Sequence, residues 1–452
     1  MDNLRVSSYM IPVKLEQEEG MYMLIHGYTG AMDIVSENLL NEIKSVETKN
    51  SFAQPMIEQL LKRGYLTTKT QEEEYAYVAR IAKALHQKSL IMNTSFTWIV
   101  SYNCNFRCPY CFENRETKNG KKKIAFTKEL VDIAYKAQDF IQPRKELRKN
   151  SITLYGGEPL LAENKEVVNY IVEEGKKRGY TFEAITNGYE LDQFLNLLTP
   201  DGINRLQITI DGPKEIHDQR RIHYRDGGTF DKIIENLQLA LDRNVKVVVR
   251  MNTDARNIEK FIELKNFFDE KQFSKYPNFN IYSARLRDYD HFTKTDHSKM
   301  TFISPQSFTS HQMELGINTI RQDRGIYKNI YEALVNKHAL SLTAIACTAQ
   351  SGGNVLDPLG NIYPCWEVIG MNHFIKGTYN EKGIIWNQEV LSKWHVNVGQ
   401  KEPCNHCRYA LICGGGCHYH NMINGIETQC GIFKSVFNKI VNKAYAKSIT
   451  NV

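Results

Sequence analysis

The placement of the cysteines constrains this chain more than any other feature of its sequence. The ten cysteines stand at positions 104, 108 and 111, at 347 and 365, at 404, 407, 413 and 417, and at 430. Cysteines that only fill a core behave as small apolar residues and would be spread along the chain. Tight groups separated by long empty stretches are typical of thiolate ligands, so the pattern indicates metal binding or catalysis.

The expected compartment supports this interpretation. The start, Met1-Asp2-Asn3-Leu4-Arg5, lacks the apolar stretch of a signal peptide, so we expect a cytoplasmic protein, in which disulfides are rare. No window holds 18 uninterrupted apolar residues, which predicts no membrane-spanning helix and no membrane partner. The 57 basic and 51 acidic side chains give a net charge of only +6, so we expect no nucleic-acid partner.

The length of the chain predicts several domains. With 452 residues, of which 42% are hydrophobic, it can bury a sizeable core and is long enough for about two to four domains. The patterns divide it into a winged-helix-like module, a bridging helix, an α/β barrel-type part, a connector and a cysteine-rich part, with expected bounds 1–70, 71–94, 95–300, 301–345 and 346–452.

Short strands and two helices make up the expected N-terminal module. The strands fall at 9–17, 21–26 and 32–35, with an extended stretch at 65–68. Ser36 can cap a helix over Glu37–Ser45, and a second helix fits Pro55–Arg63, with Gly64 as its stop signal.

Strands then alternate with helices over 95–286. Apolar, β-rich runs lie at 95–102, 151–155, 181–186, 205–210, 245–251 and 279–284, with helical patterns such as Asp231–Asp242 and Ile258–Phe268 between them. Alternation of this kind implies right-handed crossovers and a parallel sheet. Six units fall short of a closed eightfold barrel, so the sequence predicts an open, partial (β/α)6 TIM-type barrel, with a doubly wound sheet as the second choice.

The first cysteine group follows the first barrel strand. Cys104, Cys108 and Cys111 stand in a Cys-x3-Cys-x2-Cys spacing, on a loop that would open at the catalytic end of a barrel. Three thiolates can hold three irons of a [4Fe–4S] cluster and leave the fourth iron free for another ligand. The spacing favours the cluster, although three thiolates could also hold zinc with an open position or stand together by accident.

Polar turns follow the next three strands at the same end. Gly156-Gly157-Glu158-Pro159 follows the second strand, Thr186-Asn187-Gly188 the third and Asp211-Gly212-Pro213 the fourth. Glycines let a backbone approach a ligand closely, and a carboxylate can hold a cationic amine, although a lone Gly-Gly is also a simple turn. The last cysteines, Cys404-x2-Cys407-x5-Cys413-x3-Cys417, could by spacing alone form a zinc ribbon.

These motifs together resemble the radical S-adenosylmethionine (SAM) superfamily. The run Ile210-Asp211-Gly212-Pro213, with His217-Asp218 and Gly228-Thr229-Phe230, resembles its peptide-modifying branch. The resemblance implies that Cys104, Cys108 and Cys111 hold the cluster whose open iron binds SAM, and that SAM yields a hydrogen-abstracting 5′-deoxyadenosyl radical. It also implies SAM contacts. Gly156, Gly157 and Glu158 would meet the methionyl amine and Phe112 the adenine, and Thr209, Asp211 and Asn187 are further candidates.

The seven later cysteines resemble the SPASM domain, including Gly360 within the Cys-x12-Gly-x4-Cys spacing. That resemblance implies two auxiliary clusters, and so three [4Fe–4S] clusters in all. The first would be held by Cys347, Cys365 and Cys417, and the second by Cys404, Cys407, Cys413 and Cys430.

Counting ligands leaves one position to fill. Three four-iron clusters need twelve ligands, SAM takes one, and the ten thiols leave the first auxiliary cluster with three cysteines. We hypothesise that a substrate thiolate fills the last position, since metal coordination favours the thiolate. The alternative is a local ligand such as His418, His420 or water.

The N-terminal module admits three interpretations. Nucleic-acid binding is disfavoured because acidic residues outnumber basic ones in it. It could be a structural cap, or it could bind a leader peptide as an added strand at its sheet edge. Joined to the other parts, it resembles the recognition element of enzymes that mature ribosomally made peptides, which implies a precursor peptide as partner.

The whole chain resembles thioether-forming (sactipeptide/ranthipeptide) maturases, most closely those acting on the SCIFF precursor, and His26-Gly27-Tyr28-Thr29-Gly30-Ala31 adds to that impression. The family implies an external reductant such as flavodoxin or ferredoxin. One alternative is an anaerobic sulfatase maturase, although that family usually carries a further auxiliary-cluster cysteine and none is spare here. The other is a non-enzymatic iron–sulfur electron carrier, which would have no use for the Gly-Gly-Glu-Pro motif.

Overall fold

A computed structural model describes residues 4–49, 51–92, 94–113, 124–287, 300–315 and 325–450. The chain forms two compact units, each built from segments that are far apart in the sequence. The first unit comprises Met1–Ile91, Ile320–Ser351 and Ser392–Val452, and the second comprises Met92–Thr319 and Gly352–Leu391.

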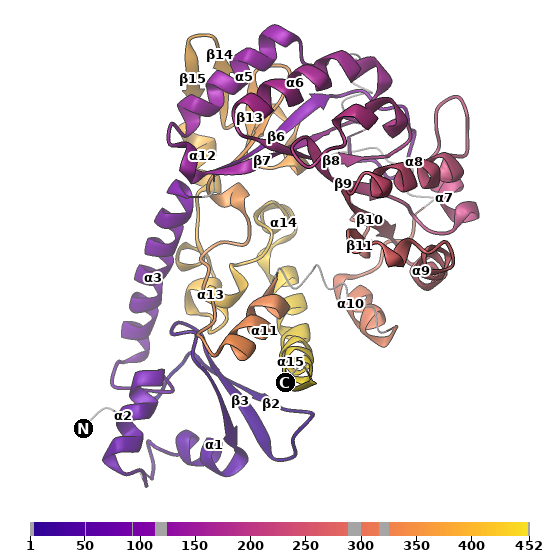
Figure 1. The fold of residues 1–452 in the computed structure, drawn as a ribbon. Coiled ribbons are helices and arrows are strands. Elements are labelled where there is room, and N and C mark those ends of the chain that lie inside the picture. The colour runs from indigo at the N-terminus through magenta and orange to yellow at the C-terminus, as the bar shows by residue number, and fades with distance from the viewer. Residues whose placement is uncertain are drawn as a thin grey trace. The chain divides into compact units, whose positions relative to one another are not determined.

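A ten-stranded sheet organises the second unit (Figure 1). Its first six strands in sequence pair in parallel as neighbours, from β6 at one side to β11 at the other. They are β6 (Thr94–Ser101), β7 (Arg148–Gly156), β8 (Thr181–Thr186), β9 (Ile203–Thr209), β10 (Lys246–Thr253) and β11 (Phe279–Arg285). Six parallel strands with intervening helices confirm the predicted α/β fold with a partial barrel.

Four further strands extend this sheet beyond β6. They are β12 (Gly353–Leu356), β13 (Asn361–Tyr363), β14 (Gly377–Asn380) and β15 (Gly383–Trp386). Strand β12 pairs in parallel with β6, with Gly353 opposite Ser95, and β13 to β15 follow as an antiparallel meander. The segment after the predicted connector is therefore part of the same sheet as the barrel strands.

Helices cover one face of the parallel strands (Figure 1). Alternate side chains of each strand pack on them, as Phe96 and Trp98 of β6 do in the main core cluster with Val131 of α5 and Val168 of α6. The helices of this unit are α5 (Lys128–Ile141), α6 (Lys165–Lys177), α7 (Lys214–Arg220), α8 (Phe230–Asp242), α9 (Lys260–Glu270) and α10 (Pro305–Glu314). The other residues of the strands point away from the helices, to a surface that we call the inner face.

The inner face is polar and only half-buried. On β7, Ile152 and Leu154 are fully buried on the helix side, whereas Thr153 and Tyr155 between them are partly exposed. A strand with one polar and one apolar side is expected where only one side of the sheet is sealed. The catalytic end of this face, where the strands finish, carries the motifs that the sequence analysis singled out.

The N-terminal module has the predicted strands and helices. Strands β2 (Met10–Lys14), β3 (Met21–His26) and β4 (Met32–Ser36) form an antiparallel sheet in that order, and β1 (Arg5–Val6) pairs with β5 (Leu66–Thr67). Ser36 caps α1 (Glu37–Lys44) by accepting a hydrogen bond from the Leu39 amide. Gly64, with a φ of 93°, ends α2 (Gln54–Arg63) in the left-handed conformation that glycine adopts at low cost.

The C-terminal cysteine segment shares a core with this module. Tyr9 of the module, Val78 and Ala82 of α3 (Gln71–Ile91), and Cys404 and Leu411 of the last segment lie in one buried cluster. The helices of this part are α11 (Ile326–Asn336), α13 (Ala410–Cys413), α14 (His418–Asn424) and α15 (Ile426–Thr450); α12 covers Gln388–Trp394. A search of the described residues finds no helix that is both long and apolar enough to cross a bilayer.

Candidate functional site

The first three cysteines lie together on the loop that follows β6. Cys108 is buried and Cys104 and Cys111 are half-buried, and Phe112 lies in the turn directly after Cys111. Burial, with Glu158 and the other two thiols nearby, raises the pKa of Cys104 well above its usual value, and burial raises the pKa of Cys111 to about 12. Thiols packed in this way ionise readily only when a cation compensates them, as iron does in a cluster.

The Gly-Gly-Glu motif holds this cysteine loop through its backbone. The Gly157 amide donates to the Ser101 carbonyl at 3.0 Å, and the Glu158 amide donates to the Asn103 carbonyl at 2.7 Å. A Cβ atom on Gly157 would lie only 2.3 Å from the Asn103 oxygen, and one on Gly156, whose φ is 130°, only 2.3 Å from the Ser101 oxygen. Neither position therefore has room for a side chain, because the backbone of Ser101 and Asn103, directly before Cys104, lies too close.

Glu158 is a buried carboxylate with three donors fixed on it. It is 2% exposed, and it accepts from the Leu160 amide at 2.9 Å, the Thr186 hydroxyl at 2.6 Å and the Asn187 amide at 2.5 Å. Burial raises its pKa to about 7 although these donors favour the charged form. A carboxylate held in one orientation beside Cys104 is suited to bind a cationic amine, because the amine offsets the cost of burying the charge.

Asn187 ties the third strand's turn to the cysteine loop. Its side-chain amide donates to the Asn105 side-chain oxygen at 2.7 Å, and its own side-chain oxygen accepts from the Tyr189 amide at 2.8 Å. The backbone of Asn187 also supplies one of the donors to Glu158. The structure thus brings Glu158, Asn187 and the cysteine loop together, as the sequence predicts.

Asp211 is fully buried and anchors the fourth strand's turn. Its carboxylate accepts from the Asn252 amide at 3.0 Å and from the Tyr110 hydroxyl, and it pairs with Arg220 at 3.4 Å. Thr209, 8% exposed, ends β9 opposite Arg250 of β10. These contacts give Asp211 a role in holding the cysteine loop through Tyr110, while direct contacts of Thr209 and Asp211 with SAM stay predictions.

Three residues of this network were not singled out from the sequence. Tyr110, inside the cysteine motif, also accepts a hydrogen bond from Arg221 Nη1 at 2.9 Å. Arg220 donates to Asp254 at 3.0 Å and lies over the Tyr110 ring. Their only sequence signal is position, because Arg220 and Arg221 follow His217-Asp218 in the peptide-modifying motif.

Among these three residues, Arg221 is the best candidate to bind a ligand. Arg221 is 8% exposed, its guanidinium carbon lies 5.4 Å from the Phe106 ring centre, and no described residue hydrogen-bonds its buried Nε. Burial lowers the pKa of Arg221, but Tyr110, Cys108 and Asp211 raise it by more, so the guanidinium stays charged beside the cysteine loop. A buried cation with a spare donor can bind a carboxylate.

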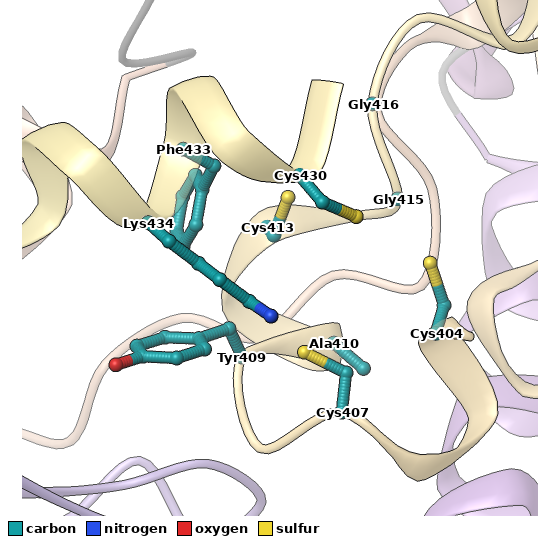
Figure 2. Close-up of a pocket in the computed structure, with 10 residues that line it drawn as sticks. All are labelled: Cys404, Cys407, Tyr409, Ala410, Cys413, Gly415, Gly416, Cys430, Phe433 and Lys434. Atoms are coloured by element: carbon teal, nitrogen blue, oxygen red, sulfur yellow. The ribbon is translucent and has the colours of Figure 1, made fainter. Parts of the chain in front are cut away.

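The second group of four cysteines surrounds a cavity in the first unit (Figure 2). Its lining includes the thiols of Cys404, Cys407, Cys413 and Cys430. Across the described residues, no three His, Cys, Asp or Glu side chains converge closely enough to hold one ion. Burial and the other three thiols raise the pKa of Cys404 to about 12. The set of four cysteine donors around one space fits a four-cysteine iron–sulfur cluster.

The third predicted set is divided between the units. Cys347 and Cys417 belong to the first unit and Cys365 to the second, so their common cluster stays a prediction. His418, next to Cys417, is buried and its Nε2 lies 2.8 Å from the Lys393 carbonyl. Its Nδ1 is buried and no described residue hydrogen-bonds it. Metal-binding histidines commonly donate their other ring nitrogen to a carbonyl, so His418 has the geometry of a local ligand.

Comparison with known proteins agrees with this geometry. Residues 98–268 match the family model described as the radical SAM superfamily. The chain is 24% identical over 375 residues to the cysteine-type anaerobic sulfatase-maturating enzyme of Clostridium novyi (strain NT), an alignment that covers 76% of this chain and 94% of that enzyme. It is 30% identical over 178 residues to the GTP 3′,8-cyclase of Campylobacter fetus subsp. fetus (strain 82-40), covering 38% of this chain and 51% of the cyclase.

Two solved structures share the fold. Native anSMEcpe with bound AdoMet superposes with a TM-score of 0.57 at 19% identity, over 78% of this chain and 99% of that one. Streptococcus suis SuiB bound to precursor peptide SuiA superposes with a TM-score of 0.51 at 15% identity, over 94% of this chain and 98% of that one. The parallel-strand part of the protein thus matches the radical SAM family model, and it shares the fold of these two solved structures.

Proposed function

We propose that this protein forms intramolecular thioether crosslinks, from a cysteine sulfur to a carbon, in a ribosomally made, cysteine-rich precursor peptide of the SCIFF type. The proposal rests on how much of this chain two solved structures cover. The anSMEcpe structure covers 78% of this chain, whereas the SuiB structure, which holds a precursor peptide, covers 94%. The difference, 94% − 78% = 16% of the chain, is close to the size of the N-terminal module.

The radical SAM site would be assembled from residues already described. Cys104, Cys108 and Cys111 would hold the cluster, which with SAM would supply the hydrogen-abstracting radical. Glu158 would bind the amine of SAM, because its carboxylate is fixed by three donors. Arg221 would bind the SAM carboxylate through its Nε, which has no hydrogen-bond partner among the described residues, and the packing around both groups would exclude water.

The leader of the peptide would add a strand to the N-terminal sheet. Strand β4 is the last strand of the sheet order β2-β3-β4 and so offers one side for pairing. Ile34 on this strand is 41% exposed, which provides apolar contact for an added strand. The other edge, β2, is already contacted by side chains, since Arg408 donates to the Met10 carbonyl and Asn442 to the Lys14 carbonyl.

A point variant tests the leader site better than a deletion. Because Tyr9 shares a core with Cys404, removing residues 1–70 would expose the neighbourhood of the cysteine cavity. Ile34→Lys instead places a charge on the β4 edge. We expect it to weaken binding of a leader-bearing peptide by about tenfold, as loss of 1.4 kcal/mol would. Ile385→Lys, at a 69% exposed position on β15, is the control and should bind normally.

The substrate cysteine would bind the first auxiliary cluster in this proposal. Thiolate coordination would favour loss of the thiol proton, and the cluster would accept the one electron that is released when a carbon radical and this sulfur form a bond. The buried Nδ1 of His418 supports the competing idea of a local ligand, so the two must be separated by experiment. Thiolate-bound clusters need a reducing compartment, and we propose a cytoplasmic location with flavodoxin or ferredoxin as reductant on that ground.

Formylglycine formation is the second candidate, because the alignment covers 94% of the Clostridium novyi sulfatase-maturating enzyme. Mass spectrometry of a co-expressed cysteine-rich precursor distinguishes the two. Thioether formation removes two hydrogens per bond, keeps the sulfur and resists thiol reductants, whereas formylglycine formation removes the sulfur. Absence of 5′-deoxyadenosine from reconstituted protein under reductant would instead favour a plain electron carrier.

A further inference from the structure

One segment of the second unit contacts residues at the ends of two barrel strands, and the residues that follow its cysteine have no role so far. It is Cys365 followed by the short helix η8 (Trp366–Val368), between β13 and β14. The Trp366 ring lies 5.8 Å from the Tyr155 ring, centre to centre, at an interplanar angle of 34°. Glu367, the next residue, forms an ion pair with Arg287. The segment is thereby fixed at two separate points.

These two points lie at the catalytic ends of different barrel strands. Tyr155 is the residue of β7 directly before Gly156, and Arg287 follows β11 by two residues. Strands β7 and β11 are separated in the sheet by β8, β9 and β10. Two residues of η8 therefore contact the ends of two strands that are not neighbours, and one of these contacts lies next to the Gly-Gly-Glu motif that is predicted to bind SAM.

Trp366 keeps a large surface exposed in this position. It is 39% exposed, whereas Trp98 and Trp394 are almost completely buried. A rigid indole left partly uncovered beside polar groups is characteristic of binding surfaces, because aromatic rings bury much area at little entropic cost. Its neighbours are informative as well, since Tyr155 adjoins the Gly-Gly-Glu motif and Trp366 adjoins Cys365.

We propose that Tyr155 and Trp366 form an aromatic seat for the reacting segment of the substrate peptide. The seat would receive an extended peptide segment, whose backbone and small side chains pack on the indole face next to the reacting cysteine. Tyr155 is close in sequence to Glu158, and Trp366 directly follows Cys365. The seat therefore suits a substrate segment that must reach both of these sites. This inference rests on the proposed function and adds a substrate-positioning site to it.

The test uses the reconstituted full-length protein and a precursor peptide. Trp366→Ala should raise the KM for the peptide at least tenfold, with a smaller effect on kcat and with wild-type iron content. Trp366→Phe should restore the KM to within about threefold, since a phenyl ring still offers a stacking face. Ile385→Ala, an exposed apolar residue of the same unit, serves as control and should match wild type.

A second measurement guards against a variant that folds poorly. In the wild-type protein, hydrogen–deuterium exchange of segment 363–368 should slow when the peptide is added. Two results overturn the aromatic seat, provided that the wild-type enzyme modifies the peptide. One is unchanged hydrogen–deuterium exchange of segment 363–368, and the other is a peptide KM within twofold of wild type for a Trp366→Ala protein with full iron content. If the wild-type protein modifies no cysteine peptide at all, the proposed function fails and the seat fails with it.

Discussion

Replacing Glu158 with glutamine is the sharpest test of the SAM site. The carboxylate accepts from Leu160 and Thr186 on Oε1 and from the Asn187 amide on Oε2. A glutamine can keep its oxygen at the Oε1 position, but its NH2 group must then face the Asn187 amide, donor against donor. The substitution thus removes one hydrogen bond inside the protein, and it removes the negative charge proposed to hold the SAM amine.

The two losses have separate magnitudes. A buried amide left without its acceptor costs about 1–3 kcal/mol, which should appear as lower stability of the protein. A lost charge-assisted hydrogen bond to the SAM amine costs about 1.5–3 kcal/mol of binding, so the Kd for SAM should rise about 10- to 150-fold.

Isothermal titration of SAM into anaerobic, iron-loaded protein measures the effect directly, with iron content and thermal unfolding as companion measurements. Glu183→Gln is the matched control, because Glu183 lies on β8 and pairs with Arg205 at 2.9 Å with 31% of its side chain exposed. It should bind SAM like wild type. An iron-loaded Glu158→Gln protein that binds SAM with wild-type affinity would refute the assignment of the amine site to this carboxylate.

Three further predictions concern other sites. Gly157→Ala should lower the iron content of the radical cluster, because its Cβ would lie 2.3 Å from the Asn103 oxygen, whereas Gly179→Ala, with nothing within 4 Å, should cost only the strain of its positive φ. His26, whose pKa burial lowers to about 4, binds a proton in the unfolded chain below pH 6.5 but in the folded chain only below about 4. Up to about 3 kcal/mol of the free energy of unfolding is therefore fully present above pH 6.5 and is lost as the pH falls toward 4. In urea unfolding, the free energy of unfolding of His26→Gln should change less with pH over that range than that of wild type. Electron paramagnetic resonance of the first auxiliary cluster should be unchanged in His418→Ala and should shift when a cysteine peptide is added; the reverse pattern would make His418 the ligand.

Local patterns sufficed for much of the fold. The capping serine at 36 and the left-handed Gly64 locate the first two helices to within a residue, because these signals act through the nearest backbone groups. The six parallel strands also follow from alternating apolar runs, since each run must bury one face. Pairing of β12 with β6 could not be read in this way, because the Gly353–Ser95 neighbours are far apart in sequence and no local pattern records their contact.

The features of the candidate site also separate into those that local sequence predicts and those that only the folded structure reveals. The sequence alone predicts which thiols and which carboxylate would carry the chemistry, since cysteine spacing and the Gly-Gly-Glu motif reflect ligand geometry over a few residues. Only the tertiary structure decided that the glycines accommodate the cysteine loop, that Tyr110 and Asp211 join two loops, and that Trp366 meets Tyr155. Those facts depend on distances between side chains brought together by the sheet, and such distances exist only once the chain has folded.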